Sequence, residues 1–169
     1  MTTHRLIPET LTAEAFAPFG EVMEAKERPA EERRFFPLDF RISGRTTMDV
    51  IWQPLAEPRF HWIERHFSVT QTFVHLGGPP AVVAVAAPTD MEDETAIPRP
   101  EEMRAFLIRP GQGYVYRTGT WHSLDRFLFE PPGARFLIVN VDPNPTQFVD
   151  TREIFDTRFE IAAPGGRIR

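Results

Sequence analysis

The sequence contains no cysteine. Disulfide bonds, a thiolate nucleophile and any zinc or iron–sulfur site with cysteine ligands are therefore excluded. Whatever chemistry the protein performs must come from histidine, carboxylate or arginine side chains, or from a metal ion held by nitrogen and oxygen ligands.

Long apolar segments are also missing. The longest apolar run, AVVAVAA at 81–87, is too short to cross a membrane, and the N-terminal segment MTTHRLIPET lacks the apolar core of a signal peptide. We therefore expect a cytoplasmic protein with no membrane partner.

An excess of positive charge and a nucleotide-binding loop are absent as well. The formal net charge of −5 argues against nucleic acid as a partner. It also repels an anionic substrate weakly, so such a substrate needs arginines near its site. Gly111-Gln112-Gly113 lacks the third glycine and the following helix of a dinucleotide fingerprint, and there is no P-loop. We expect no organic cofactor.

Short apolar segments separated by turn residues make up most of the chain. Its 169 residues include 17 prolines, 10 glycines and 15 phenylalanines, which favours a mainly β architecture. The length allows a single domain, 1–169, with a frayed tail expected at 162–169. The charged segment 26–34 is typical of a solvated loop. The expected strands are 49–53, 60–66, 81–87, 106–109, 113–117, 135–141 and 152–161, and Thr12 is expected to cap a short helix at 13–17.

The stretch ERHFSVTQTFVHLGG carries polar residues at spacings that core packing does not require. It has the pattern Glu64-x-His66-x4-Gln71-x6-Gly78. Alternation along a strand places Glu64 and His66 on one face. A turn at 68–70 then aims Gln71 at the same place. The stretch predicts a hairpin that directs a carboxylate, an imidazole and an amide into one pocket.

A second stretch, Gly111-x5-Arg117-x-Gly119-x2-His122, delivers another imidazole. Each polar residue also has a structural explanation: a buried histidine bonded to the backbone, a carboxylate paired with an arginine on the next strand, or an amide bridging two strands. We predict that Glu64, His66, Gln71 and His122 nevertheless converge.

Four further residues are candidates for substrate binding. Arg117 is the candidate partner of a small anionic substrate, because a guanidinium binds carboxylates well. Trp121 is expected to form a wall of the pocket, and Tyr116 a wall or a hydrogen-bond donor. His75 shares a face with Gln71 but matches no motif position, so a packing role is its alternative.

These two stretches resemble the two cupin motifs. In the first motif Glu64 stands where a histidine is usual and Gln71 replaces a glutamate, and in the second Arg117 replaces a proline. Glu64-Arg65-His66, Thr70-Gln71-x-Phe73, Gly111-Gln112-Gly113-x-x-Tyr116 and Trp121-His122 resemble the ureidoglycolate lyase family, also called ureidoglycolate hydrolase. The family usually has Trp-His-His-Pro-Leu at the second histidine, whereas Ser123-Leu124-Asp125 follows His122 here.

The resemblance implies a cupin-like antiparallel β-barrel or jelly roll with one or two short helices. It also implies cleavage of ureidoglycolate to glyoxylate and urea in allantoin and purine degradation, with Glu64 as the candidate base. Glu64, His66, Gln71 and His122 either hold a divalent metal, such as Mn, Fe, Ni or Zn, or act without metal as a base and hydrogen-bonding groups.

Two other functions remain open. A related cupin enzyme with the same residues acts on another small hydroxy or keto acid, and Ser123-Leu124-Asp125 favours that reading. A ligand-binding cupin without activity is the second alternative. We also expect a homodimer, because the apolar run 81–87 suits burial by a partner subunit and because members of the family often pair through their sheets.

Overall fold

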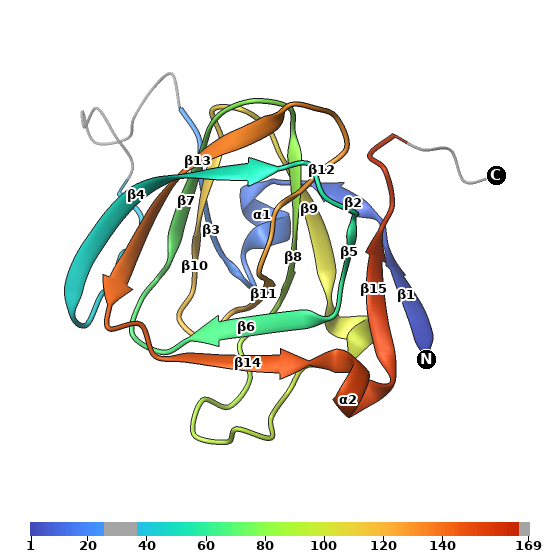
Figure 1. Ribbon diagram of the computed structural model, residues 1–169. Coiled ribbons are helices and arrows are strands. Elements are labelled where there is room, and N and C mark those ends of the chain that lie inside the picture. Colours follow the sequence, from blue (N-terminus) through green and yellow to red (C-terminus); the bar gives the residue numbers. More distant parts are fainter. Residues whose placement is uncertain (26–36, 166–169) are drawn as a thin grey trace.

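The computed structural model describes residues 1–25 and 37–165, and its strands form three sheets (Figure 1). The segment 26–34, predicted to be a solvated loop, lies outside the described residues. The five-stranded sheet has the order β3 (Gly20–Met23), β10 (Gly113–Tyr116), β7 (Thr72–Gly77), β13 (Gly133–Asp142), β4 (Arg45–Pro54).

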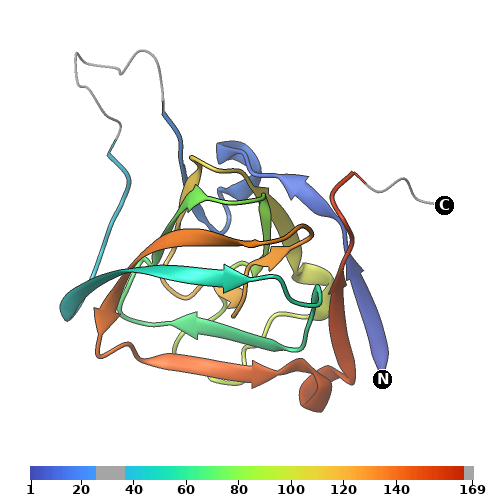
Figure 2. The ribbon, with the colours of Figure 1, turned by 45° about the horizontal axis from the view of Figure 1, so that its top comes forward.

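The seven-stranded sheet packs against the inner face of this first sheet. Its order is β14 (Thr146–Asp150), β6 (Trp62–His66), β11 (Trp121–Ser123), β8 (Ala81–Ala86), β9 (Arg104–Ile108), β2 (Pro8–Thr10), and β12 (Phe127–Leu128) also pairs with β8. The third sheet has the order β1 (Thr2–Leu6), β15 (Thr157–Ile161), β5 (Arg59–Phe60). Figure 2 shows β1 beside β15 at one flank of the molecule.

Strand β8 explains how the layers are held together. Val83 and Val85 point into the core between the two large sheets, whereas Val82 and Ala84 point into a second core under the three-stranded sheet. Both edges of the strand are paired, with β11 and β12 on one side and β9 on the other. The apolar run is therefore covered by its own chain, and it gives no reason to expect a partner subunit there.

The predicted mainly β, cupin-like fold is confirmed, with one difference in its closure. The described strands form facing sheets rather than one closed barrel, because no pairing joins the edges of the five-stranded sheet to those of the seven-stranded sheet in 1–25 and 37–165. Two pairs, β1–β15 and β2–β9, are parallel, whereas the remaining named pairs are antiparallel.

Short helices occur where side chains cap them. Thr12 accepts a hydrogen bond from the Ala15 amide at the start of α1 (Ala13–Phe16), as predicted, and η2 (Pro100–Glu102) is a single 3-10 turn. The predicted strand 152–161 is wrong in its first half. The Asp150 side chain accepts from the Arg152 amide and starts α2 (Thr151–Phe155), so only β15 is a strand.

The end of the described chain is held more firmly than the predicted tail at 162–169. Ala162 is buried, and its amide donates to the carbonyl of Leu6. Residues 166–169 lie outside the described residues. Among the described residues, no helix has the length and apolar character needed to cross a membrane.

Two motif glycines yield a prediction about stability. Gly78 has φ +112, and a Cβ there would lie 2.5 Å from the Gly133 carbonyl oxygen, whereas Gly111 has φ +86 and no atom within 4 Å of such a Cβ. We expect Gly111→Ala to lower the free energy of unfolding by about 1 kcal/mol through backbone strain alone. Gly78→Ala adds a backbone clash and should cost about 3 kcal/mol. Urea unfolding of both variants measures the difference, and equal losses would contradict it.

Candidate active site

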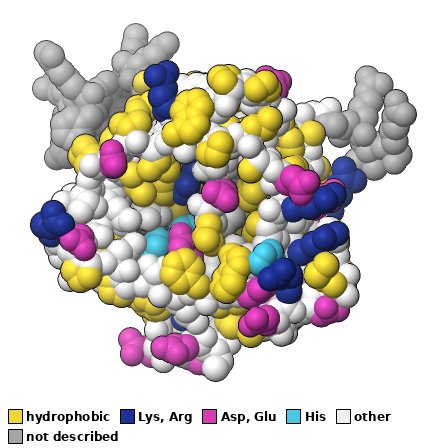
Figure 3. Space-filling view, viewed as in Figure 1, with side chains coloured by type: hydrophobic (Ala, Val, Ile, Leu, Met, Phe, Trp, Pro, Cys, Tyr) yellow, Lys and Arg dark blue, Asp and Glu magenta, His cyan; other side chains and the backbone are white. Residues whose placement is uncertain are grey.

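Neighbouring strands β6 and β11 bring a carboxylate and two imidazoles together. His122 is the cross-strand partner of Glu64, so their side chains share a face, and His66 lies on the same face two residues further along β6. A Glu64 carboxylate oxygen lies 3.7 Å from Nε2 of His66 and 3.8 Å from Nδ1 of His122. The two imidazole centroids are 5.2 Å apart. Figure 3 shows histidine and acidic side chains at the bottom of a hollow on this side of the molecule.

Hydrogen bonds fix the proton position on both imidazoles. Nδ1 of His122 lies 3.0 Å from the Ser123 carbonyl oxygen, which only accepts, so Nδ1 carries the proton. Nδ1 of His66 lies 2.8 Å from the Thr146 hydroxyl, whose own proton goes to the Asn144 carbonyl. His66 therefore also donates from Nδ1. Both Nε2 atoms are left as buried acceptors, and neither has a partner among the described residues.

Burial keeps both imidazoles neutral. It lowers the pKa of His66 to about 4, an effect that the nearby Gln71 amide partly offsets. Burial lowers the pKa of His122 well below its usual value, and the neighbouring His66 lowers it further. Burial raises the pKa of the Glu64 carboxyl group, Arg126 lowers it and Asp125 raises it. A carboxyl group with a raised pKa is a stronger base than an ordinary carboxylate, which suits it to proton transfer.

Gln71 adds a fourth acceptor to this group. Its Oε1 atom is buried without a hydrogen-bond partner in the described chain, and its side chain lines a narrow pocket with His66 and His122. We call Glu64, His66, Gln71 and His122 the acceptor cluster. Three members of the cluster could together hold a metal ion, because one ligand atom from each of Glu64, His66 and His122 lies within 4.8 Å of the others.

Tyr116 supplies a hydroxyl group at the edge of the acceptor cluster. Its ring stacks on that of His122, with centroids 4.5 Å apart and an angle of 11° between the planes. Burial raises its pKa well above the usual value, so the phenol stays protonated. Its hydroxyl group is buried and has no partner among the described residues. Tyr116 is therefore a free hydrogen-bond donor, one of its two predicted roles.

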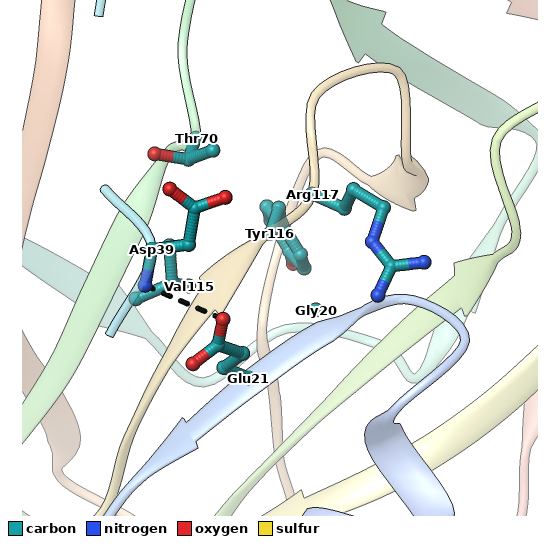
Figure 4. A pocket seen from close by; sticks show the side chains of 7 residues that line it. All are labelled: Gly20, Glu21, Asp39, Thr70, Val115, Tyr116 and Arg117. Carbon is teal, nitrogen blue, oxygen red and sulfur yellow. Dashed lines mark hydrogen bonds between the residues drawn. The ribbon is translucent and has the colours of Figure 1, made fainter. Parts of the chain in front are cut away.

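Arg117 lies at the edge of this group, where it lines the narrow pocket together with His66, Gln71 and His122. Its side chain is exposed and donates to the Ala17 carbonyl. Figure 4 shows it pointing away from Glu21 and Asp39, with which it lines a second pocket of about 80 Å³. Arg117 directly follows Tyr116, the last residue of β10, so the two side chains leave the chain in different directions.

Trp121 and His75 also have other surroundings than predicted. Trp121 precedes His122 on β11 and therefore points to the opposite face, where its Nε1 donates to Thr89 in the second core. It is not a wall of the pocket. His75 lies within the first core, its Nε2 bonded to the Pro79 carbonyl and its ring 4.5 Å from that of Phe136. This is the packing role given as its alternative.

Sequence reasoning missed Arg126. Only 4% of this residue is exposed, and its charge acts on Glu64 and on both histidines of the acceptor cluster. A usable signal was present, since a lone arginine four residues after the motif histidine stands directly before the apolar run Phe127-Leu128-Phe129. A charge next to buried strand residues calls for a partner or a ligand.

The facing sheets, with Glu64, His66 and His122 on two adjacent inner strands, define a cupin-like protein. The family model described as ureidoglycolate lyase matches residues 3–161. The chain belongs to the ureidoglycolate lyase family, as the sequence resemblance implied.

Relatives named ureidoglycolate lyase support this membership. The relative from Chelativorans sp. (strain BNC1) is 34% identical over 132 residues, which cover 71% of this chain and 76% of the relative. The relative from Rhodobacter capsulatus is 34% identical over 150 residues, covering 80% of this chain and 86% of the relative. That from Azotobacter vinelandii is 34% identical over 129 residues, covering 68% and 72%.

The lowered pKa of His66 predicts its titration. We expect the imidazole to stay neutral on acidification until about pH 4, whereas histidine in an unfolded chain protonates near 6.5. Because the unfolded state then binds more protons, His66 makes the fold less stable as the pH falls from about 6.5 to 4. NMR titration of the imidazole resonances measures this, with the chain in denaturant as the control. Protonation of folded His66 near pH 6.5 would contradict the site geometry.

Proposed function

We propose that this protein is a ureidoglycolate lyase, which cleaves ureidoglycolate to glyoxylate and urea in allantoin and purine degradation. The observation that carries the proposal is the Glu64 carboxylate, held within 3.8 Å of two neutral imidazoles in a chain of this family. The relatives matched over most of this chain bear the same name. A cytoplasmic location stays a prediction.

The reaction is an elimination that consumes no water. Glu64 accepts the proton of the carbinol hydroxyl group, the resulting alkoxide collapses to the aldehyde of glyoxylate, and the bond from carbon to the ureido nitrogen breaks. The nitrogen then takes a proton, and urea leaves. A carboxyl group whose pKa is raised by burial can carry the same proton from oxygen to nitrogen. Atoms and charge balance without another reactant.

The groups around Glu64 orient the substrate and stabilise the charge that develops on it. When no metal ion is bound, the two Nε2 atoms, which carry no proton, accept hydrogen bonds from the substrate and orient its hydroxyl and ureido groups toward Glu64. The Tyr116 hydroxyl donates to the oxygen on which charge develops. Burial of all four groups strengthens these interactions, because little water competes with them.

The acceptor cluster also fits a divalent metal ion. Its histidine Nε2 atoms and the Gln71 Oε1 atom are buried acceptors without partners in the described residues, and Glu64 adds a carboxylate. Two imidazoles with oxygen ligands suit Mn, Fe, Ni or Zn. We propose that His66, His122 and Glu64 hold such an ion, with Gln71 as the fourth ligand. A bound ion would supply Lewis acidity toward the substrate hydroxyl group.

Ser123, where the sequence departs from the family pattern after His122, has a local structural role. The Ser123 hydroxyl accepts from the Ala84 amide and donates to the Asp125 carbonyl, on the face of β11 opposite His122. This residue therefore shapes the turn after the strand and does not alter the acceptor cluster. Asp125, the last residue of the departing segment, adds to the effect of burial in raising the pKa of the Glu64 carboxyl group, so the alternative of a related cupin with another substrate keeps the support of that residue.

We also propose a homodimer, formed through the outer face of β4. Met48, Val50 and Trp52 alternate outward along this edge strand and are 67%, 51% and 56% exposed. Their partners on β13 include the half-buried Leu137 and Val139, which continue the apolar surface. An exposed apolar sheet face beside an open edge is typical of an interface.

Activity measurements test the lyase proposal. Glu64→Gln and His122→Ala should lower kcat for glyoxylate release about 10²- to 10⁴-fold, because each removes a group positioned at the reacting atoms. Glu57→Gln, on the surface, and His4→Ala, on the three-stranded sheet, are matched controls that should keep full activity. Folded wild-type protein that releases no glyoxylate from either enantiomer of ureidoglycolate, with or without Mn, Fe, Ni or Zn, would refute the proposal.

Elemental analysis tests the metal proposal. Protein purified without chelator should contain a divalent ion, and His66→Ala should lose most of it, because one ligand of the set is removed. His61→Ala, which changes a histidine outside the cluster, should retain the ion. Absence of any such ion in the wild type, together with activity unchanged by exhaustive chelation, would remove metal from the mechanism.

Light scattering tests the homodimer. The wild type should show twice the mass of the chain at micromolar concentration. The Val50→Lys variant should show the mass of a single chain, because the substitution would bury a charge in the interface. Ile154→Lys is the control, since Ile154 on α2 is 53% exposed and lies away from β4. A monomeric wild type across this range would overturn the proposal.

A further inference from the structure

Arg126 is a buried cation with few hydrogen-bond partners in the described chain. Among the described residues, no carboxylate lies within salt-bridge distance of its guanidinium. Its Nε donates to the Tyr114 hydroxyl at 3.0 Å, and its Nη1 makes a long contact of 3.4 Å with the Leu124 carbonyl. No hydrogen bond of Nη2 occurs in the described chain. A guanidinium has five N–H groups, so most of its donors are available.

Arg65 shows how this fold treats an arginine that only supports structure. It is also fully buried, but all three of its side-chain nitrogens donate hydrogen bonds. Their acceptors come from β14 and from the loop after β8: Gln147, Thr89, Asp90 and Asp93. The two arginines are similarly buried, so the missing partners of Arg126 are specific to its position. A buried cation that lacks hydrogen-bond acceptors is strongly unfavourable unless a ligand supplies the partner.

The surroundings hold Arg126 in place without satisfying its charge. Its guanidinium carbon lies 3.6 Å from the centroid of the Phe73 ring, which stabilises a cation on its face. The Gln53 side chain from β4 accepts from the Arg126 amide and fixes the turn between β11 and β12. The guanidinium is therefore positioned before any ligand binds, and such preorganisation favours affinity for a planar anion.

Arg126 lies close enough to the acceptor cluster for its charge to act on Glu64, His66 and His122. Phe73 and Tyr114, which contact the guanidinium, belong to the first core, and Tyr114 packs 5.0 Å from the Tyr116 ring that stacks on His122. This part of the interior therefore holds a cation together with a carboxylate and neutral acceptors. A small acid with a hydroxyl group next to its carboxylate supplies a partner to both.

We propose that Arg126 binds the carboxylate of the substrate and thereby places the adjacent hydroxyl-bearing carbon against Glu64. The anion site itself follows from Arg126, and only the identity of the acid rests on the proposed lyase function. The site selects small 2-hydroxy acids and discriminates against neutral amides of the same size. Arg126, rather than the exposed Arg117, is the local arginine that offsets the net negative charge of the chain.

Binding of glycolate and its neutral isostere glycolamide tests the proposal without any turnover. Calorimetry on the wild type should give affinity for glycolate about tenfold to a hundredfold above that for glycolamide, the effect expected of charge-assisted hydrogen bonds. Arg126→Met should abolish this ratio, and Arg126→Lys should retain part of it. Arg109→Met, at an exposed turn, removes the same charge and should retain the full ratio.

The outcomes separate this proposal from the lyase assignment. A ratio that survives in Arg126→Met, or that is lost in Arg117→Met instead, overturns the role of Arg126. If wild-type protein cleaves no ureidoglycolate but the ratio depends on Arg126, the lyase assignment fails and the anion site stands. If Arg126→Met does not fold, the wild type decides the matter: the Arg126 guanidinium NMR resonances must shift with glycolate and not with glycolamide.

Discussion

The pairing of β11 with β6 is the contact on which the site depends. It places His122 directly across from Glu64, and the pleat of β6 adds His66 to the same face. A shift of one residue in this register would turn His122 toward the second core and Trp121 toward Glu64. The register is secured because Trp121 fills the second core while Val85, across from His122, fills the first.

Such a cluster is unfavourable by itself, and the structure shows what offsets its cost. Buried carboxyl and imidazole groups lose hydration, which raises the pKa of Glu64 and lowers those of the histidines. The Ser123 carbonyl and the Thr146 hydroxyl each accept a hydrogen bond from one imidazole Nδ1 and so hold the rings in place. The apolar packing of β8 against both cores supplies the stability that permits unpaired acceptors.

Arg126 places a positive charge in the same interior that holds the acceptor cluster. Among the described residues, the cluster's Nε2 atoms and the Gln71 Oε1 atom accept no hydrogen bond, and the Nη2 atom of Arg126 donates none. A ligand that carries both a carboxylate and a hydroxyl group complements the two groups at once, because it supplies an anion to one and a proton to the other. The affinity of the site is thus tied to the unmet hydrogen bonds of its two halves.

Local chain rules determined part of this protein in advance. Alternation along β6 set Glu64 and His66 on one face, Thr12 capped the predicted helix, and turn residues between short apolar segments marked a β fold. The family motifs indicated His122 and Gln71. These features depend on neighbours within a few residues, so the sequence alone contains them.

Contacts between distant segments decided the rest. Whether β8 was covered by its own chain or by a partner depended on which strands flank it, and the direction of Trp121 depended on the register of β11. The burial of Arg126 required Phe73, Tyr114 and Gln53 from three other strands. Periodicity describes one strand at a time, whereas burial and electrostatic partners arise only where strands meet.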